Sequence, residues 1–66
     1  MTLFVNGEVR KAAEGLTLQQ LLDTVVPDGS RVAVVVNDTV VPLAERAGFA
    51  LKEADRVELL TFAGGG

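Results

Sequence analysis

The chain has 66 residues, a formal net charge of −3, and neither cysteine nor histidine. A chain of this length allows one small domain, and the two missing residue types exclude disulfides, cysteine nucleophiles, Cys/His zinc sites and histidine bases. The acidic balance argues against nucleic acid as a partner, whereas a hydrophobic content of 48% is too high for a disordered segment.

Short apolar runs indicate a protein that does not cross a membrane. The longest strongly apolar run, residues 32–36, falls far short of a membrane span of about 20 residues. The first residues lack the charged-then-apolar layout of a signal peptide, and a chain without disulfides gives no reason to expect an oxidising compartment. We therefore expect a cytoplasmic protein with no membrane contact.

The chain opens with a predicted β-hairpin. Residues 2–5 are rich in β-forming side chains, Asn6-Gly7 follows, and a second strand is expected over 8–13. Asn-Gly between apolar runs favours a two-residue type I′ turn, because both residues accept positive φ.

A helix is predicted to begin after Thr17 and to end at Val26. Thr17 and Gln20 have the spacing of a capping box, in which each side chain bonds the backbone N–H of the other residue. Pro27 disfavours helical geometry in the residue before it. Apolar residues at i, i+3, i+4 and i+7 give this helix one buried face, made of Leu18, Leu21, Leu22 and Val25.

The second half of the chain alternates strands and turns. Strands are predicted over 31–36 and 39–41, joined by a tight turn at Asn37-Asp38. Residues 43–46 then form a predicted helical turn, and residues 56–62 form the last strand.

The chain ends on glycines that cannot hold a fixed conformation by themselves. We therefore expect one folded domain over 1–62 and a flexible tail over 63–66.

The predicted fold class is α+β, with the element order ββαββ or ββαβββ and one main helix on one face of a mixed sheet. Alternation along the strands assigns six side chains to the helix face: Leu3, Val5, Val34, Val36, Val57 and Leu59. Four large apolar side chains then point to solvent: Phe4, Val35, Leu60 and Phe62. They form an exposed patch, unless the faces are assigned wrongly and these four are core residues.

Several segments together point to a known family. In chain order they are Asn6-Gly7, the Leu-rich helix, Val34-Val35-Val36-Asn37, Val40-Val41-Pro42, Asp55-Arg56-Val57-Glu58 and Thr61-Phe62-Ala63-Gly64-Gly65-Gly66. Their order and spacing, over the whole chain, resemble the ThiS family, the sulfur carriers of thiamin thiazole synthesis with a β-grasp (ubiquitin-like) fold.

Two residues depart from the pattern of that family. Leu43 stands where the family often has Arg, and Ala54 stands where it often has Gly. Because alanine resists the left-handed conformation that glycine permits, we expect the turn before the last strand to differ.

The resemblance implies a protein co-substrate and not an enzyme. It implies that an E1-like (ThiF-like) enzyme consumes ATP to adenylate the C-terminal carboxylate, here that of Gly66. A sulfur donor such as a persulfide protein then displaces AMP and leaves a thiocarboxylate, which gives its sulfur to a thiazole synthase (ThiG-like). No bound cofactor, metal ion or catalytic residue on the carrier is implied.

The resemblance also suggests how the tail reaches its partners. Gly64 and Gly65 would thread it into narrow sites, since glycine lets another backbone approach closely. The exposed apolar patch would dock the folded body on the partners, with Phe62 nearest to the glycines.

Three other functions stay open at this point. The small subunit of molybdopterin synthase is also a Gly-Gly sulfur carrier, but it tends to have a Pro-Pro-Val-Ser-like stretch where this chain has Leu60-Thr61-Phe62-Ala63. A ubiquitin-like modifier would share the activation as far as the adenylate and would then form isopeptide bonds to lysine. A binding module would use a sheet edge or face, and its glycines would be only a frayed tail.

Overall fold

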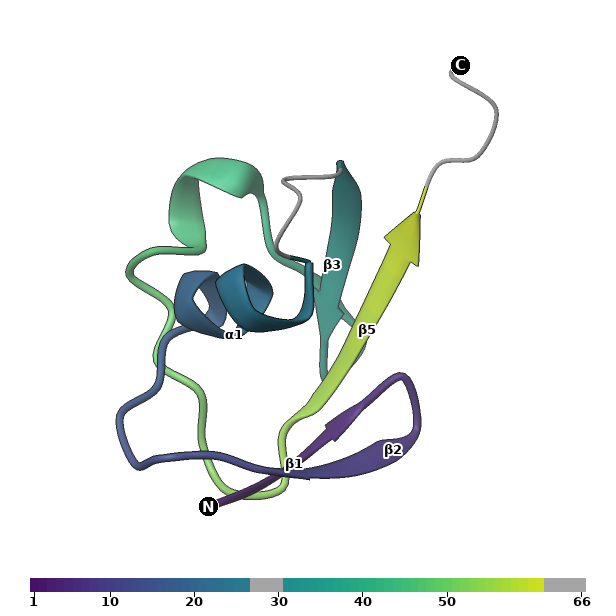
Figure 1. The fold of residues 1–66 in the computed structure, drawn as a ribbon. Helices are drawn as coiled ribbons and strands as arrows, with labels where there is room; N and C mark the ends of the chain where they lie inside the picture. The colour runs from purple at the N-terminus through teal and green to yellow at the C-terminus, as the bar shows by residue number, and fades with distance from the viewer. Residues whose placement is uncertain (27–30, 62–66) are drawn as a thin grey trace.

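The computed structural model describes residues 1–26 and 31–61. In chain order the elements are β1 (Thr2–Val5), β2 (Glu8–Lys11), α1 (Leu18–Val25), β3 (Val32–Val36), β4 (Thr39–Val40), the 3-10 helix η1 (Leu43–Glu45) and β5 (Arg56–Thr61). The strands form one sheet in the order β2-β1-β5-β3-β4, and α1 lies against one of its faces (Figure 1).

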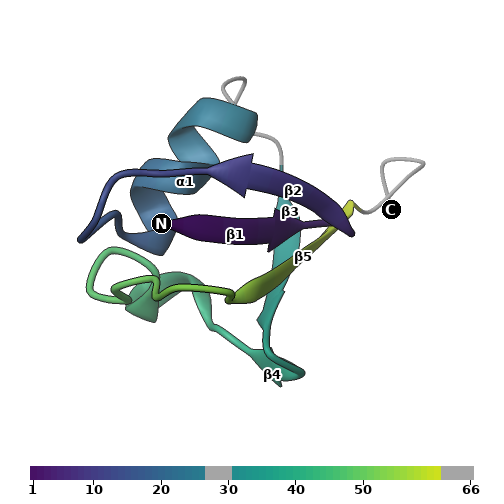
Figure 2. The same ribbon diagram turned by 90° about the horizontal axis from the view of Figure 1, so that it is seen from below.

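The sheet is mixed, as the sequence predicts. The central strands β1 and β5 run parallel, whereas β1–β2, β3–β4 and β3–β5 are antiparallel. Figure 2 shows β2 and β4 at the two opposite edges of the sheet. The last strand of the sequence therefore lies in the middle of the sheet, between the first strand and the third.

Both hairpins have the tight turns that their sequences predict. The φ angles are +50° at Asn6 and +82° at Gly7, and they are +49° at Asn37 and +70° at Asp38. Two successive residues with positive φ are the signature of a type I′ turn, whose twist matches that of the flanking strands. The register of each strand pair follows directly from these turns.

The second strand is shorter than expected. It was predicted over 8–13 but ends at Lys11, after which the Ala12 N–H still donates to the Met1 carbonyl oxygen (2.9 Å). The chain then leaves the sheet towards α1 through Gly15, whose φ of +82° is incompatible with an extended strand.

Helix α1 begins at the predicted capping box. The Gln20 N–H donates to Thr17 Oγ1 (3.2 Å), and the Thr17 N–H donates to Gln20 Oε1 (2.9 Å). These bonds satisfy two backbone donors that the helix itself leaves unpaired. The helix ends at Val25, next to the predicted end, with Val26 as its C-cap.

The core lies between α1 and the sheet face that it covers. It contains three leucines of the helix and seven residues from the sheet and its connections: Leu18, Leu21, Leu22, Leu3, Val32, Val34, Val36, Val41, Leu51 and Val57. Four of the six residues assigned to the helix face are buried, and Val5 and Leu59 are half-buried and packed against them. The predicted face assignment is confirmed for all six.

The segment between β4 and β5 closes one side of the core, a role that the sequence does not predict. The strand expected over 39–41 is observed as β4 over Thr39–Val40 only. The helical turn expected over 43–46 is observed as the 3-10 helix Leu43–Glu45. Val41 and Leu51 are each 3% exposed.

Backbone and side-chain bonds hold this segment against the rest of the domain. The Leu18 N–H donates to the Phe49 carbonyl (2.8 Å), and Arg46 Nη2 donates to the Val32 carbonyl (2.9 Å). An irregular segment can cover a core only when its backbone groups find such partners.

The turn before β5 contradicts the expectation for Ala54. This alanine has a φ of +69°, in the left-handed region. Its N–H donates to the Thr2 carbonyl (2.7 Å), and the carboxylate of the next residue, Asp55, accepts from the Lys52 N–H (2.8 Å) and from Asn37 Nδ2 (2.9 Å). These bonds impose the left-handed conformation although no glycine is present.

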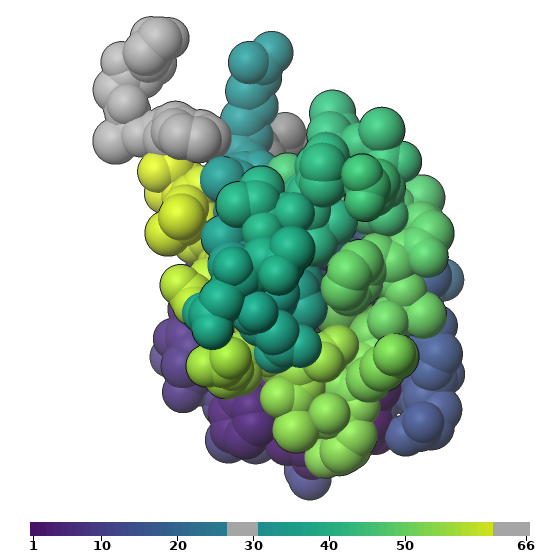
Figure 3. Space-filling view, turned by 180° about the vertical axis from the view of Figure 1, so that it is seen from behind, coloured from purple at the N-terminus to yellow at the C-terminus, as the bar shows by residue number. Residues whose placement is uncertain are grey.

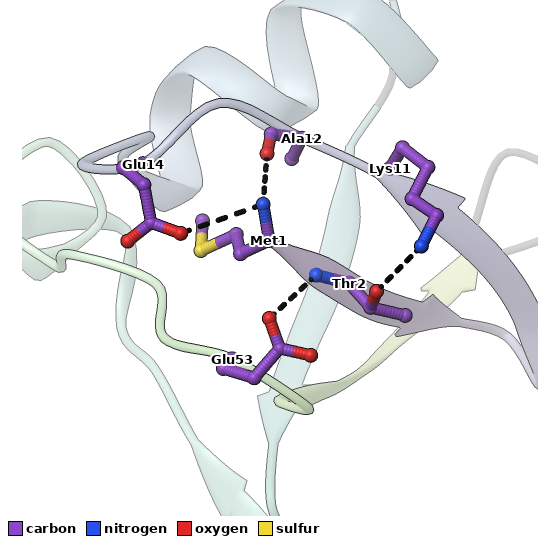
Figure 4. Close-up of polar contacts among 6 residues, drawn as sticks. All are labelled: Met1, Thr2, Lys11, Ala12, Glu14 and Glu53. Atoms are coloured by element: carbon purple, nitrogen blue, oxygen red, sulfur yellow. Dashed lines mark hydrogen bonds and ion pairs between the residues drawn. The ribbon is translucent and has the colours of Figure 1, made fainter.

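The start of β1 is fastened to its neighbours by polar contacts (Figure 4). The Met1 amine donates to the Ala12 carbonyl (2.6 Å), and the Thr2 N–H donates to Glu53 Oε1 (2.9 Å). Because β1 runs parallel to β5, these contacts lie at the opposite end of the sheet from Thr61. They belong to the scaffold and not to the end of the sheet at which β5 ends.

Candidate functional site

The sheet face opposite α1, here called the open face, carries the predicted apolar patch. Phe4, Val35 and Leu60 alternate with core residues along their strands, so they lie on the open face. Leu60 is 52% exposed, and Phe4 and Val35 are half-buried. The other assignment, in which these three are core residues, is wrong. Phe62, the fourth residue of the predicted patch, lies outside the described residues, as do Gly64, Gly65 and Gly66 of the predicted tail.

Two further valines belong to the open face and were missed. Val9 pairs with Phe4 and is 65% exposed, and Val40 pairs with Val35 and is 66% exposed. The signal was present in the sequence, because a two-residue hairpin turn determines which residues stand opposite each other. With these two residues, apolar side chains occur on the open face of all five strands.

A groove of about 530 Å³ runs along the open face beside β5. Its lining consists of Phe4, Asn6, Gly7, Arg56, Val57, Glu58 and Leu60. Arg56 Nη2 pairs with Asp38 Oδ2 at 3.2 Å, but both side chains are exposed and such a pair contributes little to stability. The groove therefore combines apolar walls with charged groups that stay available, a composition suited to a protein partner.

Asn6 links the first hairpin to the middle of β5. Its side-chain Oδ1 accepts from the Leu59 N–H (2.8 Å), and its own N–H donates to the Val57 carbonyl (2.8 Å). These bonds hold the middle of the strand, ahead of Leu60 and Thr61. Sequence reasoning read Asn6 only as a turn residue, and nothing in its local sequence signals the bond to β5.

The end of β5 lies at the surface. Figure 3 shows β5 (yellow) emerging beside the β3–β4 hairpin (teal), with the segment that follows the hairpin (green) next to it. The final described residue, Thr61, is exposed and still pairs with Val32. The described residues thus end in a central strand that stays paired with β3 up to its last residue.

The described residues contain neither a candidate metal site nor a candidate membrane-spanning helix. Within residues 1–26 and 31–61, no group of three His, Cys, Asp or Glu side chains is placed to hold a metal ion. Over the same residues, no helix has both the length and the apolar character needed to cross a membrane. The feature that the described residues do present is the apolar open face beside β5.

Comparison with known proteins gives one family and several relatives. The model of the ThiS family matches residues 3–66. A crystal structure of the thiamine biosynthesis protein ThiS from Geobacter metallireducens superposes with a TM-score of 0.84 at 33% identity, with both chains covered completely. A solution NMR structure of a thiamine biosynthesis protein from the same organism gives a TM-score of 0.78 at 35% identity, and the match covers all of this chain and 88% of that one.

Two relatives are similar over all 66 residues of this chain. A thiazole synthase of Paramagnetospirillum magneticum is 36% identical, and this chain spans only 20% of its length. An uncharacterized protein, ycf40, of Porphyra purpurea is 32% identical, and this chain spans 93% of it. The same sequence pattern therefore occurs both in a protein of similar size and within a much longer one.

Proposed function

The chain belongs to the ThiS family, and on this premise we propose that it is a sulfur carrier in thiamine biosynthesis. The observation that carries the proposal is the extent of the family match, which runs from residue 3 through the glycines to residue 66. Both solved relatives are named for thiamine biosynthesis, which supports the same pathway for this chain.

In this proposal the reacting group is the carboxylate of Gly66. A carboxylate is a poor electrophile because its negative charge is delocalised, so it needs activation before sulfur can be attached. An E1-like enzyme supplies this: a carboxylate oxygen attacks the α-phosphorus of ATP, pyrophosphate leaves, and an acyl adenylate forms.

The sulfur then enters from a donor that carries a persulfide. The terminal sulfur of the donor attacks the activated carbonyl carbon, and AMP leaves with the electron pair of the broken bond. A second thiol cleaves the sulfur–sulfur bond, so that the donor is oxidised to a disulfide and the carrier keeps a thiocarboxylate. The carrier supplies no acid, base or cofactor in these steps, which makes it a protein co-substrate of the partner enzymes.

A thiazole synthase is the proposed recipient of this sulfur. A region of the thiazole synthase of Paramagnetospirillum magneticum is 36% identical to the whole of this chain, which supports a functional association. Two modules joined in one polypeptide encounter each other at a much higher effective concentration than two separate proteins. Such a fusion is therefore an advantage when the two modules act on each other.

The open face is the proposed docking surface for the activating enzyme and for the synthase. A flexible tail alone binds weakly, because its ordering entropy must be offset by contacts elsewhere. Phe4, Val35 and Leu60 present apolar surface next to the strand that leads to Phe62. Since both enzymes must receive the same tail, a shared docking surface beside it is the simplest arrangement.

Intact-mass measurement tests the function directly. We expect the chain, after incubation with the E1-like enzyme, ATP and a persulfide donor, to gain the mass difference between one sulfur and one oxygen atom. Omission of ATP, or a variant lacking Gly65 and Gly66, is expected to abolish the gain. A stable isopeptide conjugate to lysine with no thiocarboxylate would instead identify a ubiquitin-like modifier and contradict the proposal.

A further inference from the structure

Among the described residues, strand β2 (Glu8–Lys11) has no neighbouring strand on its outer edge. The Met1 and Ala12 backbones exchange two hydrogen bonds, of 2.6 and 2.9 Å, so this pair is of the hydrogen-bonded type. Bonded and non-bonded pairs alternate along an antiparallel ladder, which makes Val9 and Lys11 members of non-bonded pairs. The N–H and C=O groups of these two residues therefore point away from β1, and no residue in the described ranges bonds to them.

This edge lacks the usual protections against pairing with another strand. Free edges are commonly blocked by a proline, a bulge or a covering segment. In β2 all four residues pair one to one with β1, none of them is proline, and Val9 on the open face is 65% exposed. The charges of Glu8, Arg10 and Lys11 are the one remaining feature that could discourage pairing. Their order along the strand determines which register of pairing brings like charges together.

We propose that the β2 edge pairs in antiparallel fashion with the β2 edge of a second copy, on a twofold axis that passes between the two Val9 residues. In such a pair, the outward-pointing N–H and C=O groups of one copy must face those of the other copy. This condition holds only when the twofold axis passes through a residue position and not between two positions, so the axis could lie at any of the four residues of the strand. Axes at Glu8, Arg10 or Lys11 place each of these residues opposite itself, and like charges directly opposite are destabilising. Only the axis at Val9 avoids this.

The Val9-centred register is also complementary in charge. It places Glu8 of each copy opposite Arg10 of the other copy, so that two opposite-charge pairs form symmetrically. Both residues lie in non-bonded positions of the new pair, where Cα atoms approach to about 4.5 Å and side chains interact most closely. Within the chain, Arg10 stands opposite Leu3 and Glu8 stands opposite Val5, so neither charge has a cross-strand ionic partner already.

The dimer would join two sheets into one and extend the apolar surface. The two Val9 side chains meet on the open face, and each of them stands beside Phe4 of its own copy. The Val9 backbones exchange two hydrogen bonds across the axis. The β5 strands, which lead to the tails, are separated from the new contact by β1 in each copy and stay unobstructed.

Charge-reversal variants test this register specifically. We expect the wild-type chain to show concentration-dependent dimerisation in sedimentation velocity, and Glu8→Arg or Arg10→Glu alone to weaken it by about tenfold or more. A mixture of the two variants should recover dimers, because each Arg then faces a Glu of the other chain. Glu45→Arg, the same charge change on η1, should leave dimerisation unaltered.

A second measurement reports on the backbone. Amide hydrogen exchange at Val9 should slow as the protein concentration rises, whereas exchange at Asp23 should not change. A wild-type chain that stays monomeric at all concentrations, or a mixture of the two variants that dimerises no better than each alone, would overturn the proposal. Circular dichroism of each variant establishes that the fold is intact.

Discussion

Ala54 is the residue at which local preference and tertiary structure conflict most clearly. Its φ of +69° lies in a region that costs an L-residue about 1–2 kcal/mol. The hydrogen bonds of its N–H to Thr2 and of the Asp55 carboxylate to Lys52 and Asn37 outweigh this cost. The chain thus retains a turn for which glycine would be the natural choice.

Replacing Ala54 with glycine is therefore expected to stabilise the domain. The relief of left-handed strain exceeds the added chain entropy of the unfolded state, which leaves a gain of about 0.5–1 kcal/mol in the free energy of unfolding. Urea unfolding measures this gain. Ala47→Gly, at an exposed residue without positive φ, is the control, and an equal gain there would show that strain at Ala54 is not the cause.

Leu60 allows the docking role of the open face to be tested without disturbing the core. It is 52% exposed on the open face, so Leu60→Ala should weaken binding to the E1-like enzyme and to the thiazole synthase by about tenfold, with little change in stability. We expect the same of Phe62→Ala. Leu43→Ala, at a residue 73% exposed outside the open face, is the matched control. Titration calorimetry with each enzyme measures the affinity, and equal losses at both leucines would contradict a specific docking face.

The central strand β5 is held by both hairpin turns. Each turn begins with an asparagine in the left-handed conformation, with φ of +50° at Asn6 and +49° at Asn37. Asn6 Oδ1 accepts from the Leu59 N–H, and Asn37 Oδ1 accepts from the Arg56 N–H (2.8 and 2.9 Å). Asparagine serves here both as a turn residue and as a link between elements that are far apart in sequence.

Loss of the Asn6 side chain should loosen β5 without disturbing the turn. Asn6→Gly keeps the positive φ but removes the acceptor, so we expect a loss of about 1 kcal/mol in unfolding free energy and faster amide exchange at Leu59. Asn6→Asp retains a side-chain oxygen and should change exchange much less. Unaltered exchange at Leu59 in the glycine variant would show that the bond contributes nothing.

Helix α1 contributes its stability through one buried stripe. Leu21 is 1% exposed, and Leu21→Ala should lower the free energy of unfolding by about 2–5 kcal/mol. Asp23→Ala, on the exposed side of the same helix, should stay within about 0.5 kcal/mol. Guanidinium titration measures the free energy of unfolding of the two variants. If the Leu21→Ala variant lost as little as the Asp23→Ala variant, the leucine stripe would not be packed in the core.

On the scale of the whole molecule, the sequence predicts well what is determined locally. The capping box at Thr17, the two turns at Asn6-Gly7 and Asn37-Asp38 and the alternation along the strands each depend on neighbouring residues. These features were sufficient to predict an α+β domain with one main helix on one face of a mixed sheet, which the structure confirms. The patch on the open face was predicted in part for the same reason.

The features that were missed depend on contacts between distant segments. Val41 and Leu51 are buried because an irregular segment folds over the core, and such a segment has no period to reveal it. The bond from Asn6 to Leu59 spans 53 positions in sequence. The predicted tail, including Gly66, lies outside the described residues, so its role stays a prediction.

The whole domain is expected to tolerate loss of the tail but not of the last strand. A chain that ends at Gly64 should unfold at nearly the same temperature as the full chain, because the two removed residues are glycines and have no side chain to pack in the core. A chain that ends at Asp55 should be unfolded, since it lacks the strand that joins β1 to β3. Thermal circular dichroism of the two truncations tests both statements.

The position of β5 has a consequence for how the domain folds. This strand follows the other described strands in sequence but is inserted in the middle of the sheet, so the hairpins β1–β2 and β3–β4 have no shared strand until residues 56–61 are available. The rate of folding is therefore expected to be limited by closing the long loop between β1 and β5. Until that loop closes, the two hairpins stay separate and remain open to proteolysis.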